Sequence, residues 1–273
     1  MWWQRQRQRQ VAAVPEKAWE TAIRALPLLQ GLDSTRLDQL RSLGVRFLHR
    51  KQLEPAQGAE LDRDIRLEIA LQAALPILEL GLDWYRGWHS LILYPDQFVP
   101  AREVMDEDGL VWIDDEPKSG EAWEQGPVIL SLADVEAGRV RDGYNVVIHE
   151  LAHKLDLLDG SANGHPPLHR EMSDAAWARD MTDAYEDHCR RSDPEDPPGN
   201  QSPGAPAQKG HGAGTTEPAI DAYGSESPAE FFAVCSETFF ELPHRLKHAY
   251  PAVYQQLRAF YRQDPAARLP TLR

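Results

Sequence analysis

The sequence feature that most restricts the fold is HELAH at residues 149–153, an HExxH motif inside the apolar segment 144–160. On an α-helix, residues four apart lie on one face, so His149 and His153 would present two imidazoles to one point with Glu150 beside them. Two imidazoles and a neighbouring carboxylate are half of a catalytic zinc site with its general base. The alternative is a half-buried helix whose histidines cap it or form local hydrogen bonds.

Charge and cysteine content narrow the class of partner and the compartment. The net charge is −14, with 29 Lys and Arg against 43 Asp and Glu, which argues against nucleic acid or an anionic membrane as partner. We therefore expect a peptide, a protein or a small molecule. The two cysteines, Cys189 and Cys235, favour a reducing compartment and cannot form a thiolate zinc site alone. No signal peptide or membrane span is expected, so a cytoplasmic protein is predicted.

The N-terminal third reads as helical. Residues 1–14 form a predicted flexible tail, and residues 15–82 a predicted N-terminal helical subdomain. Pro15 opens a first helix, Asp33 or Ser34 caps a second, and a third follows Gly58.

Residues 83–273 change to a mixed pattern, which predicts an α+β domain. Segments 90–94, 109–113 and 127–131 are short, rich in Leu, Ile and Val and bounded by turn residues, so they read as strands of a small sheet. In zinc peptidases a sheet edge near the metal commonly pairs with extended substrate, and segment 127–131 is either such an edge or an ordinary core strand.

The rest of this domain is predicted to be helical apart from one insertion. A helix is expected between residues 166 and 191, and a last helical stretch at 244–263 should break or kink at Pro251. Residues 192–218 are dominated by Pro, Gly, Ser, Asp and Gln without apolar periodicity, so we interpret them as a flexible surface insertion.

A catalytic zinc site needs a third protein ligand, and four acidic residues compete for this role. Asp159 has the spacing of one class of zinc peptidases, but the glycine that turns the chain in that class is replaced by Asp156. Asp156 itself lies one turn too far along the helix and is better suited to orienting an imidazole. Glu230 and Glu237 are the other candidates.

Glu230 opens an apolar helix for which Ser227 is the predicted N-cap and Pro228 the first residue. A carboxylate in such surroundings needs a cation or hydrogen-bond donors, and zinc would serve. Ser227 and Glu230 also match a capping box, in which Glu230 would only bond back to its own helix start. Glu237, two turns on, is the better candidate for supporting a ligand than for contacting the metal.

Two motifs together resemble a known family. HELAHKLD at 149–156 and AYGSESPAEFFAVCSETFFELP at 222–243 resemble the Mlc titration factor A family of zinc peptidases, which is similar to the anthrax lethal factor catalytic domain. The similarity also covers LELGLDW at 78–84, GPVIL at 126–130 and YRQDP at 261–265, so it spans nearly the whole chain.

The resemblance implies a zincin-like metallopeptidase domain holding one zinc ion per chain. In that family the two motif histidines and the glutamate of the PAE triplet bind zinc, which corresponds to His149, His153 and Glu230. Glu150 would be the catalytic base. Tyr223 matches a tyrosine that stabilises the oxyanion in lethal factor, although it also reads as a core tyrosine before a turn.

The same resemblance implies two functions. Members resemble aminopeptidases, and the family name comes from capture of a transcriptional repressor of the sugar phosphotransferase system, so repressor binding is the alternative to hydrolysis. Some members carry a further histidine ligand where this chain has Trp112, and its absence favours three ligands plus water.

Overall fold

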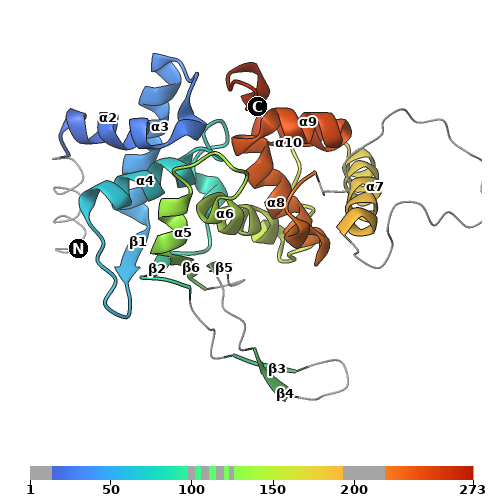
Figure 1. The fold of residues 1–273 in the computed structure, drawn as a ribbon, viewed down its shortest axis with the longest axis horizontal. Helices are drawn as coiled ribbons and strands as arrows, with labels where there is room; N and C mark the ends of the chain where they lie inside the picture. The colour runs from blue at the N-terminus through green and yellow to red at the C-terminus, as the bar shows by residue number, and fades with distance from the viewer. Residues whose placement is uncertain are drawn as a thin grey trace, which may run out of the picture.

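A small sheet lies under most of the helices in the computed structural model, which describes residues 14–97, 102–105, 111–114, 120–122, 126–192 and 219–272 (Figure 1). The architecture is mixed and rich in helix, with three parallel strands as the core of the sheet. Two predicted segments, the tail at 1–14 and the insertion at 192–218, lie outside the described residues except for Val14 and Ser192, at one end of each.

The sheet has four strands in the order β1-β2-β6-β5. They are β1 (Gln52–Pro55), β2 (Ser90–Tyr94), β6 (Val128–Ser131) and β5 (Gly120–Ala122). The pairs β1 with β2 and β2 with β6 are parallel, and β5 runs antiparallel to β6. All four residues of β6 are buried, as expected for a strand with neighbours on both sides. Segment 127–131 is therefore a core strand, and its interpretation as a sheet edge is wrong, because β5 occupies that edge.

A second, two-stranded sheet consists of β3 (Arg102–Met105) and β4 (Val111–Asp114), paired antiparallel. Figure 1 shows this hairpin projecting away from the helices. The strand predicted at 109–113 corresponds to β4, which contains Trp112, whereas β3 was not predicted.

The N-terminal helices are α2 (Glu16–Ala25), α3 (Ser34–Arg50) and α4 (Arg63–Ala74), with 3-10 turns η1 (Pro27–Leu29) and η2 (Leu82–Tyr85). Asp33 caps α3 by accepting from Arg36 N at 2.9 Å, and Asp62 caps α4 by accepting from Ile65 N at 2.8 Å. Strand β1 comes between α3 and α4 in the sequence, and it joins the sheet by pairing with β2. The division of the chain at residue 82 stays a prediction.

The remaining helical elements follow the sheet strands. They are α5 (Leu132–Ala137), α6 (Val146–Asp156), η3 (Leu157–Asp159), α7 (Asp174–Ser192), η4 (Ala222–Ser225), α8 (Pro228–Glu241), α9 (Pro243–Ala249), α10 (Pro251–Tyr261) and η5 (Pro265–Ala267). The predicted break at Pro251 is confirmed, since α9 ends at Ala249. Helix α7 begins at Asp174, later than predicted, because Pro166 and Pro167 disfavour a helix immediately before and at their positions.

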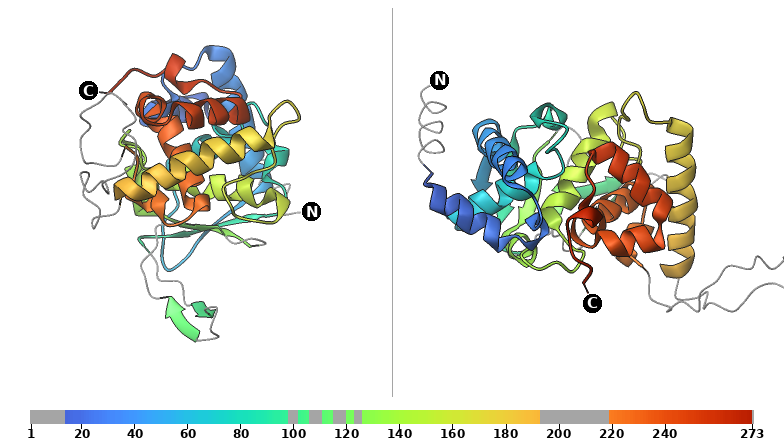
Figure 2. Two further views of the ribbon diagram at one scale, coloured as in Figure 1. Left: turned by 90° about the vertical axis from the view of Figure 1, so that its right-hand side faces the viewer. Right: turned by 90° about the horizontal axis from the view of Figure 1, so that it is seen from above.

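Helices α6 and α8 form the centre of the molecule. Every residue of α6 is buried, and so are all residues of α8 except Pro228 and Glu230. Figure 2 shows α8, α9 and α10 on one side of α6 and the N-terminal helices on the other. The core thus fixes α6 and α8 from all directions, while the first turn of α8 keeps one side accessible.

Within the part of the chain that the structure describes, no helix is both long and apolar enough to cross a membrane.

Candidate metal centre

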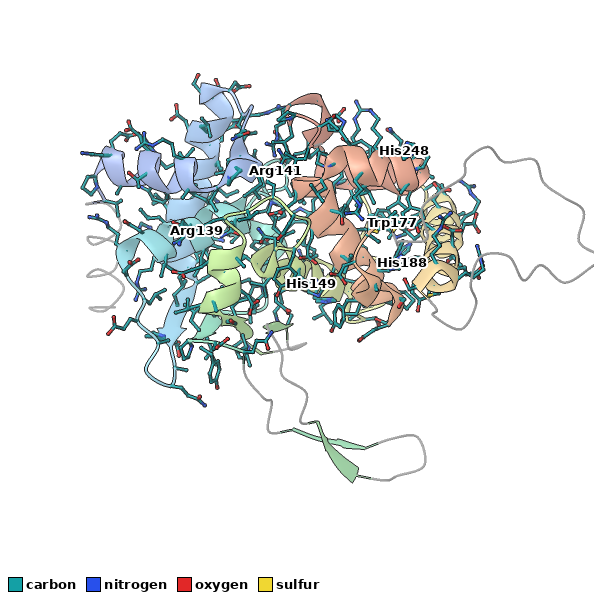
Figure 3. The ribbon with its side chains drawn as sticks, viewed as in Figure 1. Arg139, Arg141, His149, Trp177, His188 and His248 are labelled. Carbon is teal, nitrogen blue, oxygen red and sulfur yellow. The ribbon has the colours of Figure 1, made fainter. Side chains whose placement is uncertain are left out.

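The two motif histidines come together because the start of α6 is fixed by its cap. Asn145 is the N-cap residue, and its Oδ1 accepts from Ile148 N at 3.0 Å. One residue later His149 begins the motif, and His153 follows one turn on. Their ring centroids are 4.9 Å apart and their Nε2 atoms 3.2 Å apart. Both imidazoles therefore point to one place, next to Glu230 in the first turn of α8, and Figure 3 shows where His149 lies.

Glu230 supplies a carboxylate at the same place. Ser227 caps α8 by accepting from Glu230 N at 3.2 Å. The Glu230 side chain extends to the imidazoles, with Oε2 2.9 Å from His149 Nε2 and 3.2 Å from His153 Nε2. Ser227 is thus a cap, while the carboxylate that a capping box would direct back to its own helix start faces the histidines instead.

The three side chains meet a geometric test for a metal site. With zinc bonds of about 2.05 Å, ligand atoms of a tetrahedral site lie about 3.3 Å apart. The three separations here are 2.9, 3.2 and 3.2 Å. His149 and His153 are buried and Glu230 is half-buried, which leaves one side of the cluster open. Among the described residues this is the group of three His, Cys, Asp or Glu side chains whose ligand atoms converge closely enough to hold a metal ion.

The charges in this cluster are strongly coupled. Burial opposes the charged form of His149, but the carboxylates of Glu237 and Glu230 outweigh it and hold the imidazole pKa well above its usual value. Burial likewise opposes ionisation of Glu230, yet hydrogen bonds from His149 and His153 hold the pKa of this carboxyl well below its usual range. A divalent cation would occupy the position where these opposite charges now meet.

Glu150 lies beside the cluster with its carboxylate enclosed. It is 4 % exposed, and its Oε2 is buried without a hydrogen-bond partner. Burial raises the pKa of Glu150 to about 7. Such an unpaired carboxylate is costly unless a proton or a ligand's donor reaches it. The side chain is therefore suited to accepting a proton.

The edge strand β5 presses directly on Glu150. A Cβ atom placed on Gly120 would lie 2.6 Å from Glu150 Cγ and 2.7 Å from Cδ, far inside ordinary contact distance. Only a residue without a side chain can occupy this position while the strand and the carboxylate keep their places.

Glu237 supports His149 from the other side of the ring. Its Oε1 is 2.7 Å from His149 Nδ1, and its Oε2 accepts from the backbone N of Asn145. Asn145 Nδ2 in turn donates to Glu241 Oε1 at 3.0 Å and to Gln72 Oε1 at 2.8 Å. A buried polar chain thus runs from the imidazole through α8 and the α6 cap to α4.

Asp156 and Asp159 lie outside the cluster of converging ligand atoms. Asp156 is fully buried and accepts from Gly164 N at 2.7 Å, and burial raises its pKa to about 6. Its Oδ1 and the Nδ1 of His153 are both buried without a hydrogen-bond partner. The expected hydrogen bond from an imidazole to Asp156 is therefore not formed in this structure.

Tyr223 lies in the turn η4, next to His149. Its ring centroid is 5.9 Å from that of His149, and 45 % of the residue is exposed. The alternative of a core tyrosine does not hold, because a core ring would be enclosed. The ring thus lies beside His149 and is partly exposed to solvent.

Sequence reasoning missed four residues around the site. Asn145 had a local signal, since Asn is a preferred N-cap and precedes the apolar run directly. Gly120, Gln72 and Glu241 had none, because their roles depend on contacts with other elements. Gly120 is visible only through what its missing side chain allows.

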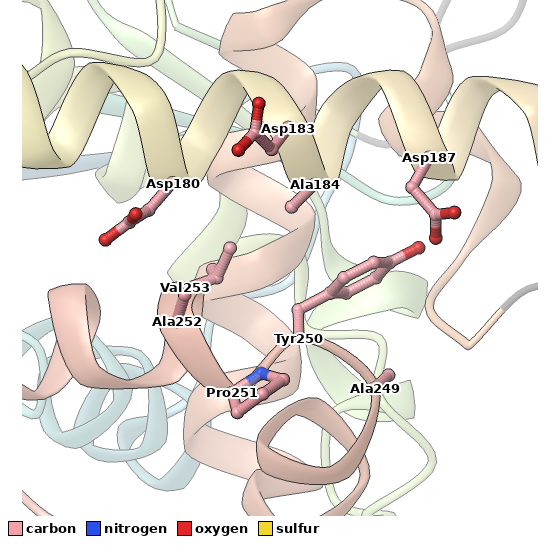
Figure 4. Close-up of a pocket in the computed structure, with 9 residues that line it drawn as sticks. All are labelled: Asp180, Asp183, Ala184, Asp187, Ala249, Tyr250, Pro251, Ala252 and Val253. Carbon is pink, nitrogen blue, oxygen red and sulfur yellow. The ribbon is translucent and has the colours of Figure 1, made fainter. Parts of the chain in front are cut away.

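A separate groove lies between α7 and the junction of α9 with α10 (Figure 4). Asp180, Asp183 and Asp187 line one wall, and Tyr250 and Pro251 lie opposite. Asp180 and Asp187 already form ion pairs with arginines of α7 itself. None of the metal-cluster residues lines this groove.

Comparison with known proteins agrees with the geometry. A family model described as Glucose-regulated metallo-peptidase M90 matches residues 1–262. A protein of Cronobacter sakazakii called Mlc titration factor A is 38 % identical over 258 residues, covering 94 % of this chain and 90 % of that protein. Proteins of the same name from Yersinia pestis and Yersinia pseudotuberculosis are 38 % identical over 253 residues, covering 92 % of this chain and 86 % of each relative.

Proposed function

The chain belongs to the Glucose-regulated metallo-peptidase M90 family, and we propose that it is a zinc-dependent peptidase of aminopeptidase type. The observation that carries the proposal is the convergence of His149 Nε2, His153 Nε2 and Glu230 Oε2 within 2.9 to 3.2 Å of one another, with Glu150 adjacent. This donor set suits one zinc ion per chain in a zincin-like domain.

The protein's own side chains would carry the proton and charge movements. When bound, zinc supplies a Lewis acid that polarises a carbonyl and makes a water molecule more acidic. Glu150 takes the proton as the water oxygen bonds to the scissile carbonyl carbon. As the carbon–nitrogen bond breaks, Glu150 returns that proton to the leaving amine. Oε2 of Glu150 is buried without a hydrogen-bond partner, so it is free to accept this proton.

Tyr223 is proposed to stabilise the oxyanion. Its exposed ring beside His149 lets the phenol donate to the oxygen that becomes negative during attack. One such donor typically contributes about 10²- to 10³-fold in kcat. Glu237 is proposed to hold His149 in the tautomer that offers Nε2 to the metal. Asp156 is proposed to support His153 through its charge, since the two side chains interact electrostatically.

Substrate backbone is proposed to pair with the edge strand β5. This strand has β6 on one side, and it lies against Glu150. An extended peptide added there would gain backbone hydrogen bonds while its carbonyl approaches the base. The proposed setting is the cytoplasm.

A second candidate function is regulatory binding. The relatives are called Mlc titration factor A, and by analogy this chain would bind a transcriptional repressor, with hydrolysis secondary. The negative charge of −14 makes nucleic acid itself an unsuitable partner.

The deciding experiment measures zinc content and hydrolysis of chromogenic aminoacyl substrates by the full chain. Glu150→Gln should keep its zinc and lose at least about 10³-fold in kcat, because the base is gone. Glu60→Gln, at an exposed glutamate outside the metal cluster, is the matched control and should behave as the unaltered protein. Undiminished hydrolysis by Glu150→Gln would refute the catalytic assignment, and repressor binding without any hydrolysis in the unaltered protein would favour the second function.

A further inference from the structure

One face of α7 contacts both ends of the turn that carries Tyr223. Tyr185, His188 and Cys189 are spaced i, i+3 and i+4, so they lie on the same side of the helix. All three are directed at backbone carbonyls of the segment 221–225. This contact joins two parts of the chain on either side of residues 193–218.

His188 holds the beginning of the turn. It is fully buried, and its Nε2 lies 3.0 Å from the carbonyl oxygen of Asp221. A carbonyl only accepts, so Nε2 carries the hydrogen. Nδ1 is buried without a partner, and burial lowers the pKa of His188, so the neutral Nε2–H tautomer is the form that fits. Figure 3 shows His188 between α7 and α8.

Tyr185 holds the end of the turn. Its hydroxyl donates to the carbonyl oxygen of Ser225 at 3.1 Å, and Cys189 Sγ lies 3.7 Å from the same oxygen. Between the two anchors the turn comes very close to its neighbours, because a Cβ on Gly224 would lie 3.3 Å from His188 Nε2 and 3.4 Å from Val234 Cβ. The turn is therefore packed tightly between α7 and α8.

The same two side chains also touch the helix that carries the third ligand. The rings of Tyr185 and His188 each lie 5.7 Å from that of Phe231, the residue after Glu230. Tyr223 lies on this turn and is 45 % exposed, so a shift of the turn backbone would move the phenol with it. The same face of α7 therefore contacts both the turn that carries Tyr223 and the helix that carries Glu230.

We propose that His188 and Tyr185 are positioning residues for catalysis, holding the turn 221–225 so that the Tyr223 phenol meets the oxyanion formed at the metal centre. This inference rests on the proposed function, because it needs Tyr223 to act in hydrolysis. Neither residue touches substrate. Their effect passes through the hydrogen bonds to Asp221 and Ser225.

A double-mutant cycle on the full, zinc-loaded protein tests the proposal. His188→Leu removes the donor and should lower kcat about tenfold or more, with KM changed less than about twofold and zinc content unchanged. In a Tyr223→Phe background the same substitution should change kcat less than about twofold, because the group it positions is already gone. An equal loss in both backgrounds would overturn the proposal.

Two further variants separate positioning from folding. His188→Gln places an amide donor near the position of Nε2 and should recover kcat to within about threefold of the unaltered protein. Tyr185→Phe removes only a hydroxyl and leaves the ring against Phe231, so it serves if His188→Leu does not fold. It should lower kcat in the Tyr223 background and not in the Tyr223→Phe background. Glu186→Gln, exposed on the same helix, is the control and should have no effect.

Hydrogen exchange provides a readout that does not depend on activity. The backbone amides of the turn should exchange at least about tenfold faster in His188→Leu and Tyr185→Phe than in Glu186→Gln. Unchanged exchange in both variants would overturn the proposal even if kcat falls. If exchange rises but Glu150→Gln hydrolyses as well as the unaltered protein, the proposed function fails while the contact itself stands.

Discussion

The Nδ1 atom of His149 lies 2.7 Å from Oε1 of Glu237, while Nε2 of the same ring faces Glu230. A buried carboxylate on Nδ1 fixes the ring orientation and favours a hydrogen on that nitrogen, so Nε2 is the nitrogen that would give up its hydrogen to bind a cation. The supporting carboxylate comes from the same helix as Glu230, two turns later, so α8 contacts this imidazole at both nitrogens.

This relationship predicts the effect of Glu237→Gln. The variant should bind zinc about 10- to 100-fold more weakly, because the neutral amide no longer supports the imidazole. Competition with a chromogenic chelator measures the dissociation constant. Glu60→Gln should leave it unchanged. An unaltered zinc affinity in Glu237→Gln would remove Glu237 from the site.

Gly120→Ala tests the contact between the edge strand and the base. The added methyl group must displace the Glu150 carboxylate or β5, and we expect kcat to fall at least about tenfold with zinc content retained. Gly44→Ala is the matched control, because a Cβ there makes only ordinary contacts and Ala favours the helix α3. Normal kcat in Gly120→Ala would mean that the strand yields without moving the base.

Metal removal should silence the protein without unfolding it. Helices α6 and α8 are held by an extensive apolar core, in which Phe231, Phe232 and Leu151 are each at most 1 % exposed. Chelation should therefore leave the far-ultraviolet circular dichroism spectrum intact and lower Tm by a few degrees, as expected when a ligand of the native state is lost. Loss of the spectrum on chelation would instead indicate a structural metal.

The buried carboxyl group of Glu241 should make the free energy of unfolding depend on pH. Burial raises its pKa from 4.5 to about 8, so the folded protein binds this proton more tightly than the unfolded chain does. The stabilisation is complete below about pH 4.5 and is lost as pH rises to about 8, with a slope of at most about 1.4 kcal/mol per pH unit.

Denaturant unfolding of Glu241→Gln across pH 5 to 8 measures this contribution. In the unaltered protein the free energy of unfolding should fall from pH 5 to 8 as Glu241 loses its proton. The variant has no such proton, so its free energy of unfolding should fall less over the same range. A matched substitution at the exposed Glu60 should leave the curve as it is. Parallel curves for Glu241→Gln and the unaltered protein would contradict the raised pKa.

Local sequence patterns were enough to predict the part of the site that lies on helix α6. The spacing of His149 and His153 places two imidazoles on one helix face whatever surrounds the helix. Glu230 is 81 residues from His149 in the chain. The third candidate ligand could therefore be chosen among four acidic residues only with the help of a family resemblance. The capping pattern at Ser227 was real, but it involved the backbone of Glu230 rather than its carboxylate.

The sheet was harder to predict because its strands are short and because their order in the sheet differs from their order in the chain. Strand β1 buries only Leu53, which gives almost no alternation to detect. Strand β5 has three residues, and its antiparallel place outside β6 is what turns an apparent edge into a core strand. Gly120 could not be found at all, since its contribution is an absent side chain.

The hydrogen bond between His188 and the Asp221 carbonyl also ties together the two stems from which residues 193–218 depart. When the two ends of a segment are held close together, doubling the length of the segment costs only about 0.6 kcal/mol in loop-closure entropy. We therefore expect that a tag inserted between residues 193 and 218 would leave the positions of α7 and of the turn 221–225 unchanged.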